Sequence, residues 1–241
     1  MSNAMIRLSP RAALGVVLLA LTPPAAANAA ERNYSVSSFD RIRVEGPFDV
    51  RLGTNQPPGG HAEADARTLD LLTLQVEGTT LIVRLSSNGW GESPQAARTA
   101  PVITLRTPSL RSALVNAGGK LAITPMKGQR LDLAVNGSGA ISAAGIDADE
   151  LYATVIGTGT IKLAGRTARA QLLSNGSGAI AAEALTVNDL IVRLDGTGET
   201  HAAARFTAKI TTNGLGKVTV DGNPACTVTA LAGGPIICGR P

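Results

Sequence analysis

Aromatic residues are scarce in this chain of 241 residues, in which three Phe, two Tyr and one Trp make up 2% of the sequence. Proteins that bind single-stranded nucleic acid stack the bases on aromatic side chains, and this sequence offers no such platform. The net charge is only +4 and the basic residues do not cluster, so the charge predicts an ordinary solvated surface. We therefore expect no nucleic-acid partner.

Long apolar runs are also missing, apart from AALGVVLLAL at 12–21, which follows Arg7 and Arg11 and precedes AAANAA at 25–30. A run of this length falls well short of the roughly 20 residues that span a bilayer. Basic residues, a short apolar core and an A-x-A site are typical of a cleaved secretory signal. We predict a signal peptide at 5–29 after a tag scar at 1–4 (MSNA), no stable membrane insertion, and a periplasmic, cell-surface or secreted mature protein.

Cysteine is limited to Cys226 and Cys238. Two cysteines in an exported chain favour a disulfide, because the compartment is oxidising. Two thiols alone would make a poor metal site, and neither His61 nor His201 is close to them in the sequence. We predict a structural Cys226–Cys238 disulfide that closes the C-terminal end.

Glycine, by contrast, is abundant, and it recurs in one phrase. The phrase appears as VNGSGAISA at 135–143, VIGTGTIKL at 155–163, SNGSGAIAA at 174–182, LDGTGETHA at 194–202 and TNGLGKVTV at 212–220. Weaker copies are VNAGGKLAI at 115–123 and ALAGGPIIC at 230–238. A motif repeated every 18–20 residues indicates a repeat architecture before it indicates chemistry.

Apolar residues alternate with polar ones on both sides of each glycine phrase, which predicts strands with one inward face. Four equivalent positions form the inward columns. The two before the glycines are Ala113, Leu133, Ala153, Leu172, Val192, Ile210, Val228 and Val115, Val135, Val155, Ser174, Leu194, Thr212, Ala230. The two after them are Leu121, Ile141, Ile161, Ile180, Thr200, Val218, Ile236 and Ile123, Ala143, Leu163, Ala182, Ala202, Val220, Cys238.

A unit this short cannot bury its apolar face alone, but it can when stacked on copies of itself about 4.8 Å apart. The sequence therefore predicts an all-β fold, a single-stranded parallel β-helix or solenoid of about seven or more coils. A propeller would need roughly 40 residues per blade, and the leucine-rich frame is missing. We expect one domain over 34–241. Its strands at 34–100, including 38–52 and 68–85, form the first coils or a cap, with an exposed loop at 86–100, and the repeats fill 101–241.

The glycines are predicted to be structural corners, since glycine adopts positive φ without strain. The corner residues are Gly137, Gly139, Gly157, Gly159, Gly176, Gly178, Gly196, Gly198, Gly214 and Gly216. Asn side chains beside them would hydrogen-bond from coil to coil. The alternative is an anion-binding nest. No Asp follows the corners as in calcium-binding repeats, so we expect no metal and no cofactor there.

Catalytic residues are hard to find. The column of Asp132, Tyr152, Gln171 and Ile191 contains no second acid, and the best catalytic group is Lys162, Glu199 and His201 on one outward face. This group is a weak candidate, and a solvated surface histidine is the preferred interpretation of His201. Trp90 is a weak candidate for ligand contact, because an exposed aromatic in a loop can stack on a sugar.

The opening FDRIRVEGPFDVRL at 39–52, followed by repeated GSG and GTG corners, resembles the family named putative auto-transporter adhesin, head GIN domain (DUF2807). The resemblance would cover residues 36 to the end, implies an exported β-helical protein, and brings no catalytic residues. We predict a non-catalytic binding or adhesion module that engages glycan or cell-envelope components, with oligomers forming through coil ends. The alternative is a β-helix lyase or hydrolase that acts on polysaccharides.

Overall fold

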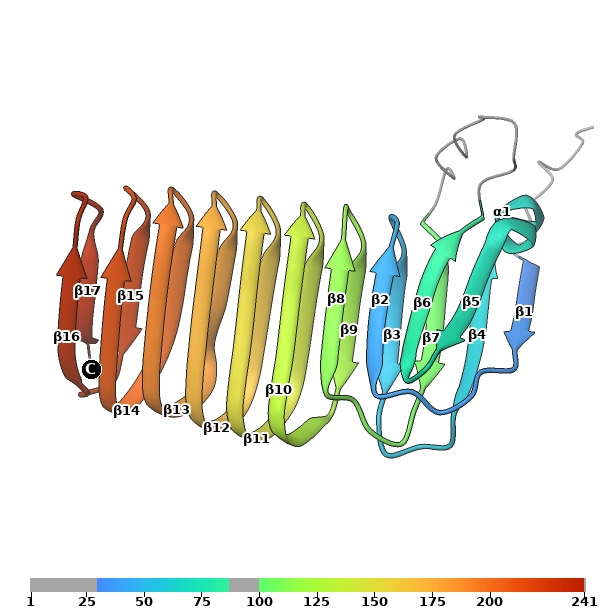
Figure 1. Cartoon of the computed structure of the whole chain (residues 1–241), viewed down its shortest axis with the longest axis horizontal. Helices are drawn as coiled ribbons and strands as arrows, with labels where there is room; N and C mark the ends of the chain where they lie inside the picture. Colours follow the sequence, from blue (N-terminus) through green and yellow to red (C-terminus); the bar gives the residue numbers. More distant parts are fainter. Residues whose placement is uncertain (1–29, 87–99, 241) are drawn as a thin grey trace, which may run out of the picture.

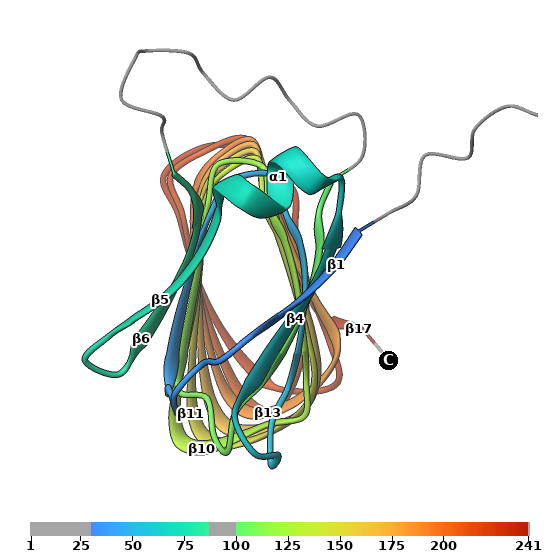
Figure 2. The same cartoon turned by 90° about the vertical axis from the view of Figure 1, so that its right-hand side faces the viewer.

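The computed structural model describes residues 30–86 and 100–240, so the predicted signal peptide and Trp90 lie outside the described residues. Figure 1 shows a row of coils stacked side by side along one long axis, and Figure 2 shows the flattened oval outline of the stack, with two long faces. Neighbouring coils pair through parallel strands in register, for example Val135 with Val155 and Gly137 with Gly157. The predicted all-β solenoid is confirmed.

Each face of the solenoid is a row of parallel strands. The front face in Figure 1 consists, along the axis, of β6 (Thr80–Leu85), β2 (Arg41–Glu45), β8 (Ser112–Asn116), β10 (Met126–Gly137), the second halves of β11 (Ala140–Gly157), β12 (Thr160–Gly176), β13 (Ala179–Gly196) and β14 (Glu199–Thr212), and β16 (Ala225–Ala230). The back face consists of β7 (Val102–Arg106), β3 (Asp49–Gly53), β9 (Lys120–Thr124), the first halves of β11 to β14, β15 (Lys217–Asp221) and β17 (Ile236–Arg240).

The inward columns predicted from alternation form the core. From Ala113 to Val220 every member is at most 3% exposed, including the polar Ser174, Thr200 and Thr212. Only the last coil departs from this pattern, where Val228 is 46% exposed although its register partner Ile210 is fully buried. Among the described residues no coil packs on the far side of this one, so Val228 lies at an exposed end of the core.

The predicted number of coils is wrong: the solenoid has about six turns, not seven or more. The segments that join one repeat to the next are also strand, because β11 to β14 each continue around the end of the coil opposite the glycines. We call the glycine segment the upper corner and the opposite segment, at 144–149, 164–168, 183–188, 203–206 and 221–224, the lower bend.

The first coils do not follow chain order. Strand β2 lies between β6 and β8, and β3 lies between β7 and β9, so the coil at 41–53 is inserted between coils that come later in the chain. Apolar alternation does not specify the neighbour of a strand. The insertion therefore has no signal in the sequence.

The N-terminal end of the stack is covered. Strand β1 (Ala30–Tyr34) pairs antiparallel with β4 (Gly59–Ala64), β4 with β7, and β5 (Leu72–Glu77) with β6. Helix α1 (Ala66–Leu71) lies over the upper-corner end of the first coils (Figure 2) and buries Leu69. The strands predicted within 68–85 are present as β5 and β6, but residues 68–71 belong to the helix, which Asp65 caps by accepting hydrogen bonds from the backbone N and Oγ1 of Thr68. In the described part of the chain, no helix is long and apolar enough to cross a membrane.

Candidate binding groove

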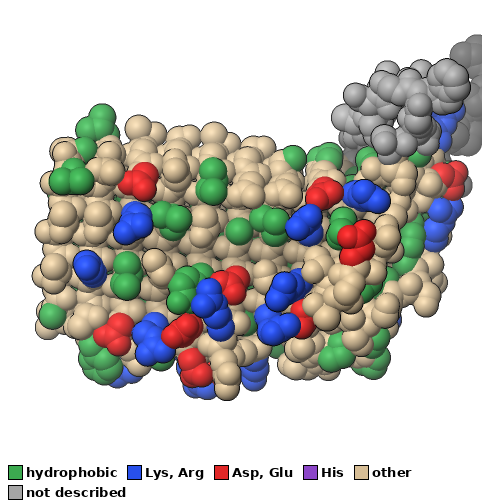
Figure 3. Space-filling view, viewed as in Figure 1, with side chains coloured by type: hydrophobic (Ala, Val, Ile, Leu, Met, Phe, Trp, Pro, Cys, Tyr) green, Lys and Arg blue, Asp and Glu red, His purple; other side chains and the backbone are tan. Residues whose placement is uncertain are grey.

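A groove of about 300 Å³ lies on the outer surface of the front face, where the second halves of β11 to β14 leave the lower bend. Outward positions two residues apart on each strand place its side chains in two adjacent columns. One column is Tyr152, Gln171, Ile191 and Lys209, and the other is Glu150, Arg169, Asp189 and Thr207. Figure 3 shows charged side chains gathered over this part of the face.

The centre of the groove is apolar. Ile191 is 44% exposed although it is a large aliphatic residue, and Tyr152 lies two coils away in the same column. The guanidinium of Arg130 lies over the Tyr152 ring, 4.2 Å from its centroid, so that face of the ring is covered. Ile191 is therefore the main apolar contact that the groove offers to a ligand.

Charged groups line the other column and are paired with one another. Arg169 Nη2 donates to Glu150 Oε1 at 2.5 Å, and Thr207 Oγ1 donates to Asp189 Oδ1 at 2.6 Å. The hydrogen bond from Arg169 holds the pKa of the Glu150 carboxyl below its usual range. Two acids and two bases, Glu150, Asp189, Arg169 and Lys209, leave the lining with no net charge.

The sequence reasoning found one column of this site and missed the other. It followed Asp132, Tyr152, Gln171 and Ile191 and found no second acid there. Glu150 and Asp189 lie in the neighbouring column, two coils apart. Their signal was available, because both are acids at the same offset from a corner, two repeats apart.

The predicted catalytic group on the back face is not assembled as one site. Glu199 contacts Lys217 at 3.2 Å, and His201 Nε2 lies 2.6 Å from Asp221 Oδ2. Lys162 shares the column of His201 but is separated from it by Ala181. Glu199 and His201 are thus each paired with a neighbour outside the predicted group.

A second cluster went unnoticed in the sequence. Glu31, His61 and Glu63 on β1 and β4 place their ligand atoms within 4.8 Å of one another. The antiparallel pairing of β1 with β4 creates this cluster, and no local pattern predicts that pairing. His61 is already bound by Asn33 at 3.1 Å and Glu63 at 3.4 Å, and both glutamates are exposed, so we assign no ion to it.

The corner glycines have two different structural roles. Gly137, Gly157, Gly176 and Gly196 have φ between +103° and +137°, which disfavours side chains. The second glycine of each of these corners does not have positive φ. A Cβ on one of them, Gly159, would nevertheless lie 2.6 Å from the Gly139 carbonyl oxygen of the preceding coil. The first glycine sets the backbone angle, and both glycines let the coils approach, because a Cβ on Gly157 would likewise lie 2.8 Å from Gly137 O.

The corner amides are used within the fold. Thr158 N donates to Gly137 O and Thr160 N to Gly139 O, each at 3.0 Å, and the other corners repeat this pattern. Amides bonded to the preceding coil do not face a ligand, so these bonds argue against the anion nest. The Asn residues beside the corners form one hydrogen bond between coils, in which Asn136 Nδ2 donates to Asn116 Oδ1 at 3.2 Å. The next coil has Ile156 at this position, so the ladder of Asn side chains ends there.

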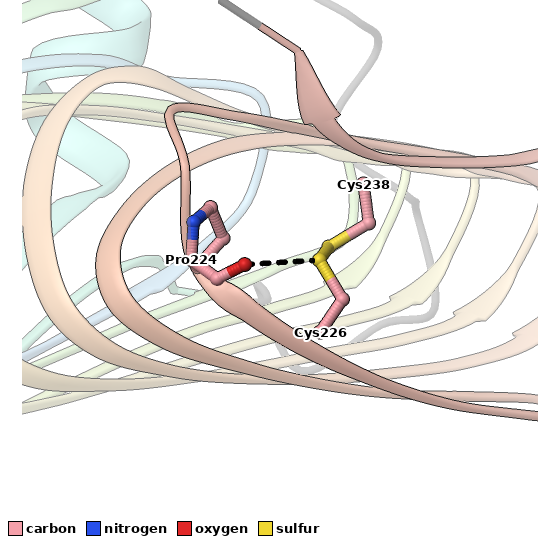
Figure 4. The surroundings of a disulfide bond; sticks show 3 residues. All are labelled: Pro224, Cys226 and Cys238. Atoms are coloured by element: carbon pink, nitrogen blue, oxygen red, sulfur yellow. Dashed lines mark hydrogen bonds between the residues drawn. A yellow bond between two sulfur atoms is a disulfide. The ribbon is translucent and has the colours of Figure 1, made fainter.

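The predicted disulfide between Cys226 and Cys238 is present. It joins β16 on the front face to β17 on the back face across the interior of the last coil (Figure 4). Cys226 pairs in register with the buried Ala208, and Cys238 with the buried Val220. The disulfide therefore covers the open end of the core.

Comparisons with solved structures agree on the fold. A putative adhesin from Bacteroides fragilis aligns with a TM-score of 0.80 at 20% identity, over 88% of this chain and 97% of that one. A putative lipid binding protein and a putative adhesin, both from Parabacteroides distasonis, align at 0.73 and 0.70 with 23% and 18% identity, each over 87% of this chain and 96% of the other. Likeness at this level of identity shows the fold alone. No curated protein matches the chain.

The opening phrase and most of the glycine corners lie within a match to one family model. The family model described as "Putative auto-transporter adhesin, head GIN domain" matches residues 38–224, which include the inserted coil and most of the corners. The match spans well over half of the sequence. This chain therefore belongs to the DUF2807 family, which carries that description.

Proposed function

We propose that this protein is an exported, non-catalytic adhesion-type module that binds a neutral glycan of the cell envelope or its surroundings in the front-face groove. The family description and the adhesin names of the structural relatives support adhesion, and the disulfide supports export. The observation that carries the ligand class is a groove with an apolar centre and an uncharged balance of polar groups.

The lining favours a sugar for two physical reasons. Ring hydroxyls need both donors and acceptors, and Gln171, Arg169 and Asp189 supply both within two coils. The apolar face of a sugar ring packs on an aliphatic or aromatic side chain, which Ile191 provides. The groove also repeats with the coil spacing of about 4.8 Å, a step comparable to one sugar residue in an extended chain.

Anionic partners fit less well. Binding to nucleic acid or to an anionic lipid surface requires an excess of positive charge. Here each base in the lining is balanced by an acid, and Arg169 is already paired with Glu150. We therefore propose a neutral ligand.

Catalysis is the weaker alternative. Glu150 and Asp189 are two coils apart, roughly 10 Å by strand spacing, which approaches the carboxylate separation of inverting glycosidases. Such an enzyme needs one carboxyl with a raised pKa to serve as general acid. Arg169 lowers the pKa of Glu150, so this carboxylate is ionised at neutral pH and cannot donate a proton.

The test is a panel of soluble polysaccharides, with neutral glucans, mannans and galactans as one arm and uronic-acid polymers as the other. Binding is followed by calorimetry and cleavage by new reducing ends. We expect binding in the neutral arm without cleavage, and an affinity at least tenfold lower for Ile191→Lys. Ile156→Lys is the matched control, because Ile156 is 49% exposed on the same face but outside the groove. Cleavage by the unmodified protein, or equal loss in both variants, would overturn the proposal.

A further inference from the structure

The two ends of the solenoid present different edges. At the N-terminal end, β1 and β5 carry charged residues, among them Glu31, Arg32 and Glu77, and α1 covers the core. Charges on an outer strand oppose pairing with another chain. At the other end, β16 and β17 form the last coil, and among the described residues each pairs with one strand only, β14 and β15 respectively.

The last coil carries much less charge. Residues 222–239 contain no Asp, Glu, Lys, Arg or His, and the one charged residue in its two strands is Arg240 at the end of β17. Val228 faces the axis and is 46% exposed, and Leu231 at the last upper corner is 73% exposed. The coil thus combines unpaired backbone groups, exposed apolar side chains and little electrostatic protection against association.

The disulfide also holds this edge in one conformation. Cys226 lies at the second residue of β16 and Cys238 at the third residue of β17, so the two edge strands are tied together. A preorganised edge loses little conformational entropy when another chain pairs with it.

We propose that the β16–β17 coil is a self-association surface on which a second copy of this chain docks tail to tail. A two-fold axis perpendicular to the solenoid places the two last coils against each other and makes the strands across the junction antiparallel. A second copy brings the same number of edge strands, the same apolar centre and only one charged residue in those strands, Arg240 at the end of β17. Any other partner would have to match both strands independently.

The capped N-terminal end limits the assembly to two copies. A head-to-tail contact would build an open filament, whereas a two-fold contact uses the same surface on both copies and closes. Because α1 and the charged strands β1 and β5 cover the N-terminal end, the open filament has no second surface.

The experiment is sedimentation velocity on the protein purified from the periplasm with its disulfide intact, across a wide concentration range. We expect a monomer–dimer equilibrium without larger species. Val228→Lys should raise the dissociation constant at least tenfold, because it places a charge at the centre of the junction. Ile156→Lys, with similar exposure on a middle coil, should leave it within twofold.

Hydrogen exchange on the unmodified protein gives a second readout that needs no variant. Amides of 225–230 and 236–240 should exchange more slowly as the concentration rises, whereas those of β1 and β5 should not change. A monomer at all concentrations, filaments that lengthen with concentration, or equal effects of the two lysine variants would overturn the proposal.

Discussion

The upper corner and the lower bend both reverse the direction of the chain, but only the upper corner has a constant length. At the upper corner, glycine backbones contact each other from coil to coil, and the segment has the same length in each coil from β10 to β14. The lower bends at 144–149, 164–168, 183–188 and 203–206 differ in length, and the register shifts of β11–β12, β12–β13 and β13–β14 lie there. The upper corner thus has one length in these coils, whereas the lower bend accommodates several.

The largest effect should come from inserting one residue at each turn. A Ser inserted after Thr158 interrupts the corner bonds and shifts the following strand, so that its inward residues face solvent. We expect a loss of about 4 kcal/mol or more in the free energy of unfolding, measured with denaturant. The control, a Ser inserted after Arg166, lengthens a bend that is already variable and should cost about 1 kcal/mol or less. Equal losses would contradict the comparison.

The last coil has no following corner to hold it, so there the disulfide takes that role. Cys226→Ser/Cys238→Ser removes a cross-link over a short loop, which the chain-entropy model values at roughly 3 kcal/mol. Hydrogen exchange should show residues 222–240 losing protection before the other coils. Reduction of the unmodified protein should reproduce the pattern, and uniform loss along the solenoid would argue against an end effect.

A single side chain at the upper corner should also be costly. Gly157→Val places a β-branched residue at φ +110° with its Cβ 2.8 Å from Gly137 O. We expect a loss of at least about 1–2 kcal/mol in a denaturant titration. Gly78→Val, at φ +62° with open space around it, separates backbone strain from collision with the next coil and should cost less. An unchanged midpoint for Gly157→Val would contradict the role of this corner.

The smallest effect concerns an ion pair between neighbouring lower bends. Arg166 Nε donates to Asp147 Oδ1 at 2.8 Å and holds the pKa of Asp147 below its usual value near 4. A lowered pKa in the folded state means that the pair stabilises the protein above the unfolded pKa and loses this effect as the pH falls through the folded pKa. Asp147→Asn should lower the melting temperature slightly at pH 7 and not at pH 2–3. Asp149→Asn, in the same bend without an ion pair among the described residues, should do neither.

Features that repeat with the coil period could be predicted from the sequence, whereas the pairing of particular strands could not. Inward columns such as that of Leu133, Ala153 and Leu172 follow from alternation at a fixed period, and the disulfide follows from two cysteines in inward columns of one coil. The inserted coil of β2 and β3 could not be predicted, because many apolar strands could serve as its neighbours.

The candidate site divides in the same way. Tyr152, Gln171 and Ile191 share one predicted outward column, so their proximity was predictable. Glu150 and Arg169 also share one outward column on adjacent coils, so their proximity follows from the repeat as well. The cover of Arg130 over Tyr152 depends on a diagonal contact, which the alternation that identifies the strands does not encode.

The proposed glycan groove is tested most directly by hydrogen exchange with and without the best-binding neutral polysaccharide of the panel. The account predicts slower exchange at 150–152, 169–171, 189–191 and 207–209, and unchanged exchange on the back face at 140–143 and 160–163. Protection on the back face instead, or no neutral polysaccharide that binds at all, would contradict it.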